Sequence, residues 1–140
     1  LKWIEKNVNS NSTILDYGSG SGILSIASKF YKANFVEGVE IDDKAIENAK
    51  QNNRLNNIAL NYHYSKTFKT NKKYNIILAN ILLPTLVQLS PLFKKLAQKK
   101  VVISGILSSQ KDFLIESYDW IEMKEIDRID EWVLMYGKLQ

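Results

Sequence analysis

The sequence predicts an α/β protein with a seven-stranded, doubly wound sheet that is mostly parallel and closes with an antiparallel C-terminal hairpin strand. Up to Tyr118, short apolar or β-branched runs alternate with helix-like segments, which is the rhythm of a parallel sheet. After Tyr118, two strand-like runs follow with only a few polar residues between them, so these are expected to pair as a hairpin. Together these patterns indicate a Rossmann-like architecture.

Seven runs carry the strand signal, because each is short, rich in β-branched or aromatic residues and bounded by polar or turn-forming residues. No low-complexity linker separates them. In chain order the expected strands are residues 12–18, 34–41, 58–64, 74–80, 99–107, 119–126 and 131–139.

Four helices are expected between these strands, at residues 22–31, 42–53, 84–98 and 108–118. Asp42 or Asp43 suits the N-cap of the second helix, since an aspartate side chain accepts from free N–H groups there. Pro84 suits the first turn of the third helix. Pro91 is expected to kink or split that helix.

Composition limits the class of protein. The 140 residues, 45% of them hydrophobic, suit one globular domain, and no run approaches the roughly 18 apolar residues of a membrane span. The first residues are amphipathic rather than signal-like, so a soluble, cytoplasmic protein is expected. There is no cysteine, which excludes disulfides and cysteine-based metal or nucleophile chemistry.

The net charge of +4 comes from scattered lysines. A solvated surface explains them, and a basic face that helps to dock an RNA-rich or acidic partner is the alternative. No membrane binding and no direct sequence-specific nucleic-acid binding are expected.

A glycine loop follows the first expected strand. Asp16 is followed by Gly18, Gly20 and Gly22, and a helical pattern begins at once. At such a strand-to-helix turn, a ligand can approach the backbone only where no Cβ intervenes. The start of the helix favours an anionic group, so a nucleotide-like ligand is expected, although glycines in a tight turn can also be purely structural.

The spacing of the loop distinguishes the ligand. Dinucleotide sites read G-x-G-x-x-G, whereas this loop reads G-x-G-x-G. The next strand ends at Glu40 and Ile41, where a carboxylate can accept hydrogen bonds from both hydroxyls of a ribose. These features predict S-adenosylmethionine as cofactor, with Asp16, Gly18, Gly20, Gly22, Glu40 and Ile41 in its site.

The fourth expected strand ends at Asn80. Its side-chain oxygen can accept a hydrogen from an attacking amine and fix the amine's distance from a methyl group, which makes Asn80 the candidate catalytic residue. The alternative is a turn-forming asparagine at a strand end.

At these residues the sequence resembles a known family. The segments "LDYGSGSGILSIAS", "VEGVEIDDKAIENAKQN", "ANIL", "ISGIL" and "EWVLM" are together similar to the catalytic domain of the bacterial ribosomal protein L-eleven methyltransferases, class I enzymes that use S-adenosylmethionine to methylate protein amino groups. The likeness covers nearly the whole chain, and implies that residues 1–140 form one class I methyltransferase domain without an N-terminal substrate-recruiting domain.

The resemblance implies that Gly18, Glu40 and Asn80 contact the cofactor, with Asn80 also beside the substrate amine. The implied substrate is a protein, specifically a ribosomal protein. The family commonly has Cys at the position of Ser19 and Asp at that of Glu40. It often has an acidic residue near the adenine, for which Ser65 is the nearest candidate here.

Methyl transfer from a sulfonium to an amine needs alignment and a free lone pair, and no metal is expected. Three functions remain open at this point: a protein amino-group methyltransferase, a class I methyltransferase for another protein or a small molecule, and a non-catalytic nucleotide-binding module. His63 is expected to be structural or a pocket wall. Trp132 is expected to pack the hairpin against the sheet or to line a pocket.

Overall fold

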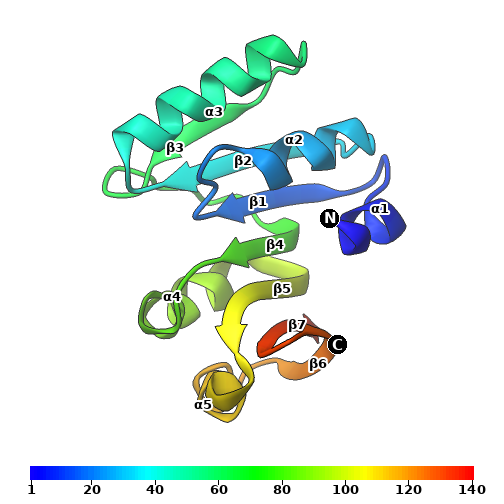
Figure 1. Cartoon of the computed structure of the whole chain (residues 1–140), viewed down its shortest axis with the longest axis vertical. Helices are drawn as coiled ribbons and strands as arrows, with labels where there is room; N and C mark the ends of the chain where they lie inside the picture. The colour runs from blue at the N-terminus through cyan, green and yellow to red at the C-terminus, as the bar shows by residue number, and fades with distance from the viewer. The chain divides into compact units, whose positions relative to one another are not determined.

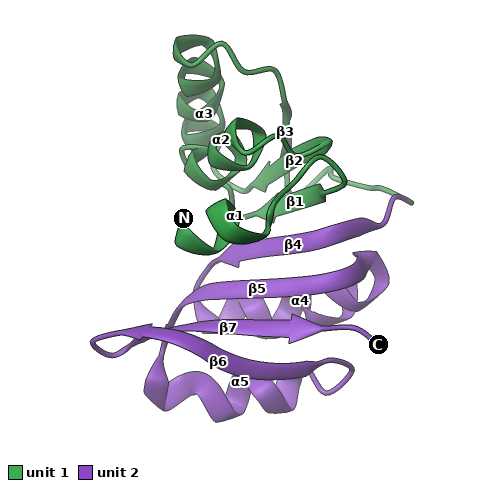
Figure 2. Ribbon diagram, turned by 90° about the vertical axis from the view of Figure 1, so that its right-hand side faces the viewer, with its two compact units in different colours: residues 1–71 green, residues 72–140 purple.

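The computed structural model describes all of residues Leu1–Gln140. The chain separates into two compact units, residues 1–71 and residues 72–140 (Figures 1 and 2). Each unit has its own strands with helices packed against them.

The first unit is a three-stranded parallel sheet with three helices. Its strands lie in the order β3-β2-β1, and α2 packs against β1 and β2 while α3 packs against β3 and β2. The elements are α1 (Lys2–Asn7), β1 (Thr13–Tyr17), α2 (Ile23–Phe30), β2 (Phe35–Glu40), α3 (Asp43–Leu55) and β3 (Asn61–Tyr64).

Parallel register brings the carboxyl ends of the three strands to one edge of this sheet. Tyr17 at the end of β1 pairs with Val39, and Glu40 at the end of β2 pairs with Tyr64. The loops that leave β1, β2 and β3 therefore lie at the same edge, where ligands bind in open α/β sheets.

Local signals set the start of α3 as expected. The carboxylate of Asp42 accepts a hydrogen bond from the N–H of Lys44 at 2.9 Å, which makes Asp42 the N-cap. Strand β3 is shorter than predicted and begins at Asn61. The carbonyl of Leu60, just before it, accepts a hydrogen bond from the side chain of Asn53 at 3.3 Å.

The second unit has four strands in the order β4-β5-β7-β6, with α4 packed against β4 and β5 and α5 packed against β6 and α4 (Figure 2). Strands β4 and β5 are parallel, and β7 is antiparallel to both β5 and β6. The elements are β4 (Tyr74–Asn80), α4 (Leu83–Leu96), β5 (Ala97–Leu107), the 3-10 turn η1 (Ser108–Gln110), α5 (Lys111–Ser117), β6 (Glu122–Ile129) and β7 (Trp132–Lys138).

Of the two outcomes predicted for Pro91, the split is wrong, because α4 is one continuous helix across it, and the kink stays a prediction. A proline removes one N–H donor, and this helix is held instead by its buried face, which includes Leu86 and Phe93. The hydroxyl of Tyr118 reinforces that packing by donating to the carbonyl of Leu86 at 2.6 Å.

Several boundaries in this unit differ from the prediction by a few residues, and the starts of β5 and β6 show why. Strand β5 follows α4 directly at Ala97, because Ala97 is already buried and paired with Tyr74. Strand β6 begins at Glu122 rather than residue 119, since residues up to Ile121 complete the turn that ends α5.

The predicted fold class is confirmed: the chain is an α/β protein with seven strands, mostly parallel, and an antiparallel C-terminal hairpin. None of its helices combines the length and the apolar character that crossing a membrane requires.

Candidate functional site

The glycine loop at the end of β1 is held against the end of β2. The N–H groups of Gly18 and Ser19 both donate to the carbonyl of Val39, at 2.7 and 3.0 Å. Gly18, Gly20 and Gly22 have φ of 75°, 54° and 86°, in the left-handed region that side chains disfavour. The loop conformation therefore depends on glycine at three alternate positions.

The surroundings of the loop glycines differ. A Cβ added to Gly20 would meet no atom within 4 Å, so the chain there borders open space. A Cβ on Gly22 would instead collide with the hydroxyl of Tyr62, and one on Gly38 in β2 with the Tyr62 ring. Gly20 is thus open to a ligand, whereas Gly22 and Gly38 make room for Tyr62.

Tyr62 fixes the packing below the loop and was not predicted from the sequence. It pairs with Gly38 across β2 and β3, and its hydroxyl donates to the side-chain oxygen of Asn53 at 2.8 Å. Burial, together with the nearby carboxylate of Asp16, raises the pKa of Tyr62 to about 12. A glycine in mid-strand was the available signal, because it often marks the close approach of another group.

Glu40 ties the glycine loop to the turn after β2. One carboxylate oxygen accepts from the N–H of Gly20 at 3.0 Å, and the other accepts from the N–H groups of Ile41 and Asp42 at 2.7 and 3.0 Å. The sequence predicted Glu40 at this edge, and the structure shows that its carboxylate already organises three backbone donors.

Asp16 is a buried carboxyl with one unpaired oxygen. Its Oδ2 accepts from the hydroxyl of Ser25 at 2.6 Å, while Oδ1 has no hydrogen-bond partner. Burial raises its pKa to about 6, against the lowering effect of Ser25. The buried hydroxyl of Ser19 also lacks a partner, so two polar atoms beneath the loop are unsatisfied.

Ile41 and Ser65, two further predicted cofactor residues, both lie next to Glu40. Ile41 directly follows it and is 64% exposed. Ser65 follows β3, and its N–H donates to the carbonyl of Glu40 at 2.9 Å. All seven predicted cofactor residues of the first unit therefore lie in the β1–α2 loop or at the carboxyl ends of its strands, namely Asp16, Gly18, Gly20, Gly22, Glu40, Ile41 and Ser65.

Asn80 is the last residue of β4 in the second unit, and it is exposed. It pairs with Ser104 of β5. Its carboxamide makes no hydrogen bond to the protein, so both its donor and its acceptor are available.

His63 and Trp132 were predicted with open roles. The Nε2 atom of His63 lies 2.6 Å from a carboxylate oxygen of buried Glu37 on the neighbouring strand, which supports a structural role. Trp132 lies on β7 opposite Ile129 and is 51% exposed, so packing leaves half of it uncovered. Its pocket-lining role remains a prediction.

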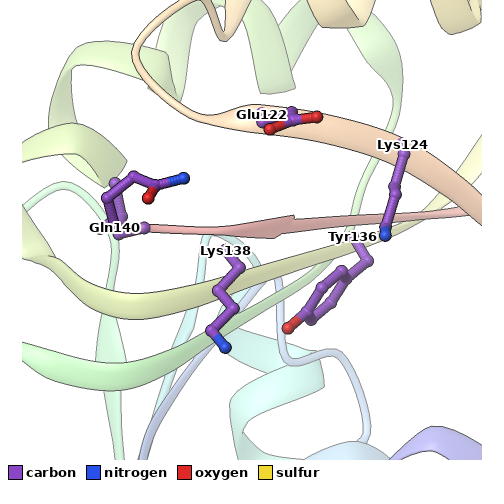
Figure 3. Close-up of a pocket in the computed structure, with 6 residues that line it drawn as sticks. Glu122, Lys124, Tyr136, Lys138 and Gln140 are labelled. Atoms are coloured by element: carbon purple, nitrogen blue, oxygen red, sulfur yellow. The ribbon is translucent and has the colours of Figure 1, made fainter.

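A surface pocket in the second unit contains none of the predicted residues (Figure 3). It lies where β6 begins and β7 ends, at the pair Glu122 and Lys138. Lys138 pairs with Lys100, near the start of β5, whereas Asn80 pairs near the carboxyl end of β5. The pocket is therefore at the opposite edge of this sheet from Asn80. Its lining residues are Glu122, Lys124, Tyr136, Lys138, Leu139 and Gln140.

Comparison with known proteins gives consistent matches along the chain. The model of the family "Ribosomal protein L11 methyltransferase (PrmA)" matches residues 1–140. A ribosomal protein L11 methyltransferase from Dechloromonas aromatica is 38% identical over 98% of this chain and 47% of its own length. One from Dictyoglomus thermophilum is 32% identical over 99% of this chain and 48% of its own length. The chain thus spans about half the length of the curated relatives it matches.

Solved structures agree with this result. The crystal structure of a ribosomal protein L11 methylase from Lactobacillus delbrueckii subsp. bulgaricus superposes with a TM-score of 0.88 at 26% identity, covering 96% of this chain and 72% of that one. A methyltransferase from Pyrococcus furiosus, at 16% identity and a TM-score of 0.81 over 98% of this chain and 79% of that one, shows the same fold. The family model and the relatives together show that this chain belongs to the ribosomal protein L11 methyltransferase family.

Proposed function

We propose that the protein transfers a methyl group from S-adenosylmethionine to amino groups of a protein, either lysine side chains or an N-terminus. The substrate proposed is the large-subunit ribosomal protein L11, which the names of its relatives specify. The observation that supports this best is the family match along residues 1–140. We propose further that these residues form one class I methyltransferase domain that works in the cytoplasm, where ribosomal proteins are made.

The residues at the carboxyl edge of the first unit fit the proposed cofactor. Asp16 offers an unpaired buried oxygen, which suits a cationic donor such as the amino group of S-adenosylmethionine. The open space over Gly20 admits a ligand close to the backbone. As at any helix start, the first N–H groups of α2 lack helical acceptors and suit a carboxylate.

Glu40 is proposed to accept hydrogen bonds from the ribose hydroxyls. Three backbone N–H groups already occupy its carboxylate, and a carboxylate has about four acceptor sites, so ribose hydroxyls share this carboxylate with the loop or replace one of its bonds. Ile41 and Ser65 would then flank the nucleoside, beside the residue that holds it.

Asn80 is proposed to orient the substrate amine. When bound, S-adenosylmethionine supplies a methyl group activated by its sulfonium. A lysine with an ordinary pKa of about 10.4 must lose a proton before its nitrogen has a free lone pair. The side-chain oxygen of Asn80 can then accept a hydrogen from the neutral amine and hold the lone pair in one direction.

The test uses the full natural polypeptide with radiolabelled S-adenosylmethionine and purified ribosomal protein L11. The expected result is transfer of label to ribosomal protein L11, with the modified amino groups located by mass spectrometry. Blocking the amino groups of ribosomal protein L11 beforehand should abolish the transfer. Label transfer to a different protein or to a small molecule would overturn the substrate. Calorimetry with S-adenosylhomocysteine and with NAD tests the cofactor, and binding of NAD at least as tight would overturn it.

A further inference from the structure

Gly105 lies inside β5 at the point where the strand is irregular. Its φ is 86°, in the left-handed region, and the register of β5 against β7 shifts between Ile103 and Ile106. The residue before it, Ser104, pairs with Asn80 at the end of β4. The irregularity of β5 is therefore placed directly beside the proposed catalytic side chain.

The side chain of Asn80 occupies the space that a side chain at position 105 would need. A Cβ built on Gly105 would lie 2.6 Å from the Oδ1 atom of Asn80, closer than real Cβ contacts allow. The backbone N and O atoms of Ile81 would be 3.5 Å away, at ordinary van der Waals distance. The conflict is thus with the carboxamide of Asn80 alone.

No hydrogen bond to the protein fixes this carboxamide, so its direction depends on the surfaces against which it lies. An exposed asparagine without hydrogen bonds would otherwise sample several side-chain rotamers. Because Gly105 has no Cβ, the carboxamide oxygen of Asn80 can pack against its Cα. Any larger residue at position 105 would force the carboxamide to rotate away.

The tetrapeptide Ser-Gly-Ile-Leu occurs twice, at residues 21–24 and 104–107, and both glycines have the same φ of 86°. At Gly22 the missing Cβ makes room for Tyr62, whereas at Gly105 it makes room for Asn80. By contrast a Cβ added to Gly20, whose φ is also left-handed, would meet no atom within 4 Å, so left-handed backbone alone does not account for the contact at Gly105.

We propose that Gly105 is a positioning residue for methyl transfer, which holds the carboxamide of Asn80 in the direction that orients the substrate amine. This inference rests on the proposed function, because it assigns Gly105 a role only through Asn80. Positioning of this kind is felt mainly in the transition state, and a displacement of about 1 Å can cost roughly a hundredfold in rate.

The experiment is a double-mutant cycle on the full natural polypeptide with Gly105→Ala, Asn80→Ala and the double variant. Single-turnover methylation of ribosomal protein L11, the dissociation constant of S-adenosylhomocysteine and the melting temperature are measured for each. Asp130→Ala is the matched control, because it also puts alanine at a left-handed position of the same unit, with a φ of 53°, on an exposed hairpin turn.

The expected result is that each single variant is at least about tenfold slower, that cofactor binding changes by less than about twofold, and that the double variant is no slower than Asn80→Ala. The destabilisation caused by Gly105→Ala should also shrink in the Asn80→Ala background, where the conflicting oxygen is gone. Asp130→Ala should keep the wild-type rate.

Three outcomes would overturn the inference. If Gly105→Ala has a normal rate while Asn80→Ala is slow, Gly105 has no positioning role, and the proposed function is left intact. The same conclusion follows if the rate losses of the two single variants multiply in the double variant. A normal rate for Asn80→Ala removes the role of Asn80 itself. If Gly105→Ala does not fold, Gly105→Asn takes its place, since asparagine tolerates left-handed backbone and still carries the Cβ.

Discussion

The carboxylate of Glu40 accepts a hydrogen bond from the backbone N–H of Gly20 at 3.0 Å, which joins the end of β2 to the middle of the glycine loop. The other oxygen of the same carboxylate holds the N–H groups of Ile41 and Asp42. One side chain therefore shapes both loops at this edge of the first unit, and it is also the group proposed to bind the ribose.

Glu40→Ala should weaken S-adenosylhomocysteine binding by about 1.5 to 3 kcal/mol, the range for hydrogen bonds to a charged group. It should also lower the melting temperature, since three backbone donors lose their acceptor. Calorimetry and thermal unfolding measure the two effects. Glu47→Ala, which removes an exposed carboxylate of α3, is the control, and an unchanged dissociation constant for Glu40→Ala would remove Glu40 from the site.

Gly20→Ala and Gly22→Ala should separate binding from stability. Both positions are left-handed, so each substitution costs roughly 1–2 kcal/mol in strain. Gly22→Ala additionally displaces Tyr62 and should lose about 1–3 kcal/mol more, as overpacked cores do. Gly20→Ala should be the more stable of the two and yet bind S-adenosylhomocysteine poorly. Equal melting temperatures would contradict the role assigned to Tyr62.

Asp16→Asn should change how stability depends on pH. The folded protein raises the pKa of Asp16 from 3.8 to about 6, so the folded state binds this proton more tightly than the unfolded state. Its contribution to stability is therefore complete below the unfolded pKa and is lost as the pH rises through the folded pKa. Wild type should lose about 3 kcal/mol of unfolding free energy from this group between about pH 4 and pH 7.

Urea unfolding across that pH range checks this prediction, with the exposed Asp43→Asn as control. The unfolding free energy of Asp16→Asn should not show the decline between about pH 4 and pH 7 that is expected for wild type. At low pH the two unfolding free energies should converge, apart from a constant offset due to the amide. Parallel curves for wild type and Asp16→Asn would show that the buried carboxyl does not titrate in this range.

Asn80→Ala should lower the single-turnover methylation rate by roughly a hundredfold while changing cofactor affinity little, because orientation of the amine acts chiefly in the transition state. Asn75→Ala, near the other end of β4, is the control and should keep the rate. Thermal unfolding of both variants excludes general destabilisation. A rate loss fully explained by unfolding would leave Asn80 as a strand-end residue only.

Much of the first unit was predictable because its signals are local. The glycine spacing, the acidic end of β2 and the N-cap at Asp42 each depend on residues close together in the sequence, and the structure has all three where expected. The fold class followed from the alternation of strands and helices and from the closing hairpin.

The parts that sequence reasoning missed depend on contacts between distant segments. Tyr62 meets Gly38 only through the register of β2 with β3, and Asn80 meets Gly105 only through that of β4 with β5. Neither register can be read from one strand. The split predicted at Pro91 is absent for a similar reason, since burial of α4 against its sheet outweighs the local preference of proline to end a helix.

The packing of Tyr62 on Gly38 links two positions in evolution. A side chain at position 38 fits only if the ring at position 62 is absent or smaller, because a Cβ on Gly38 would overlap that ring. The two positions should therefore vary together among relatives, with glycine at the first wherever the second is aromatic. A family in which they vary independently would have to cover the underside of its glycine loop in a different way.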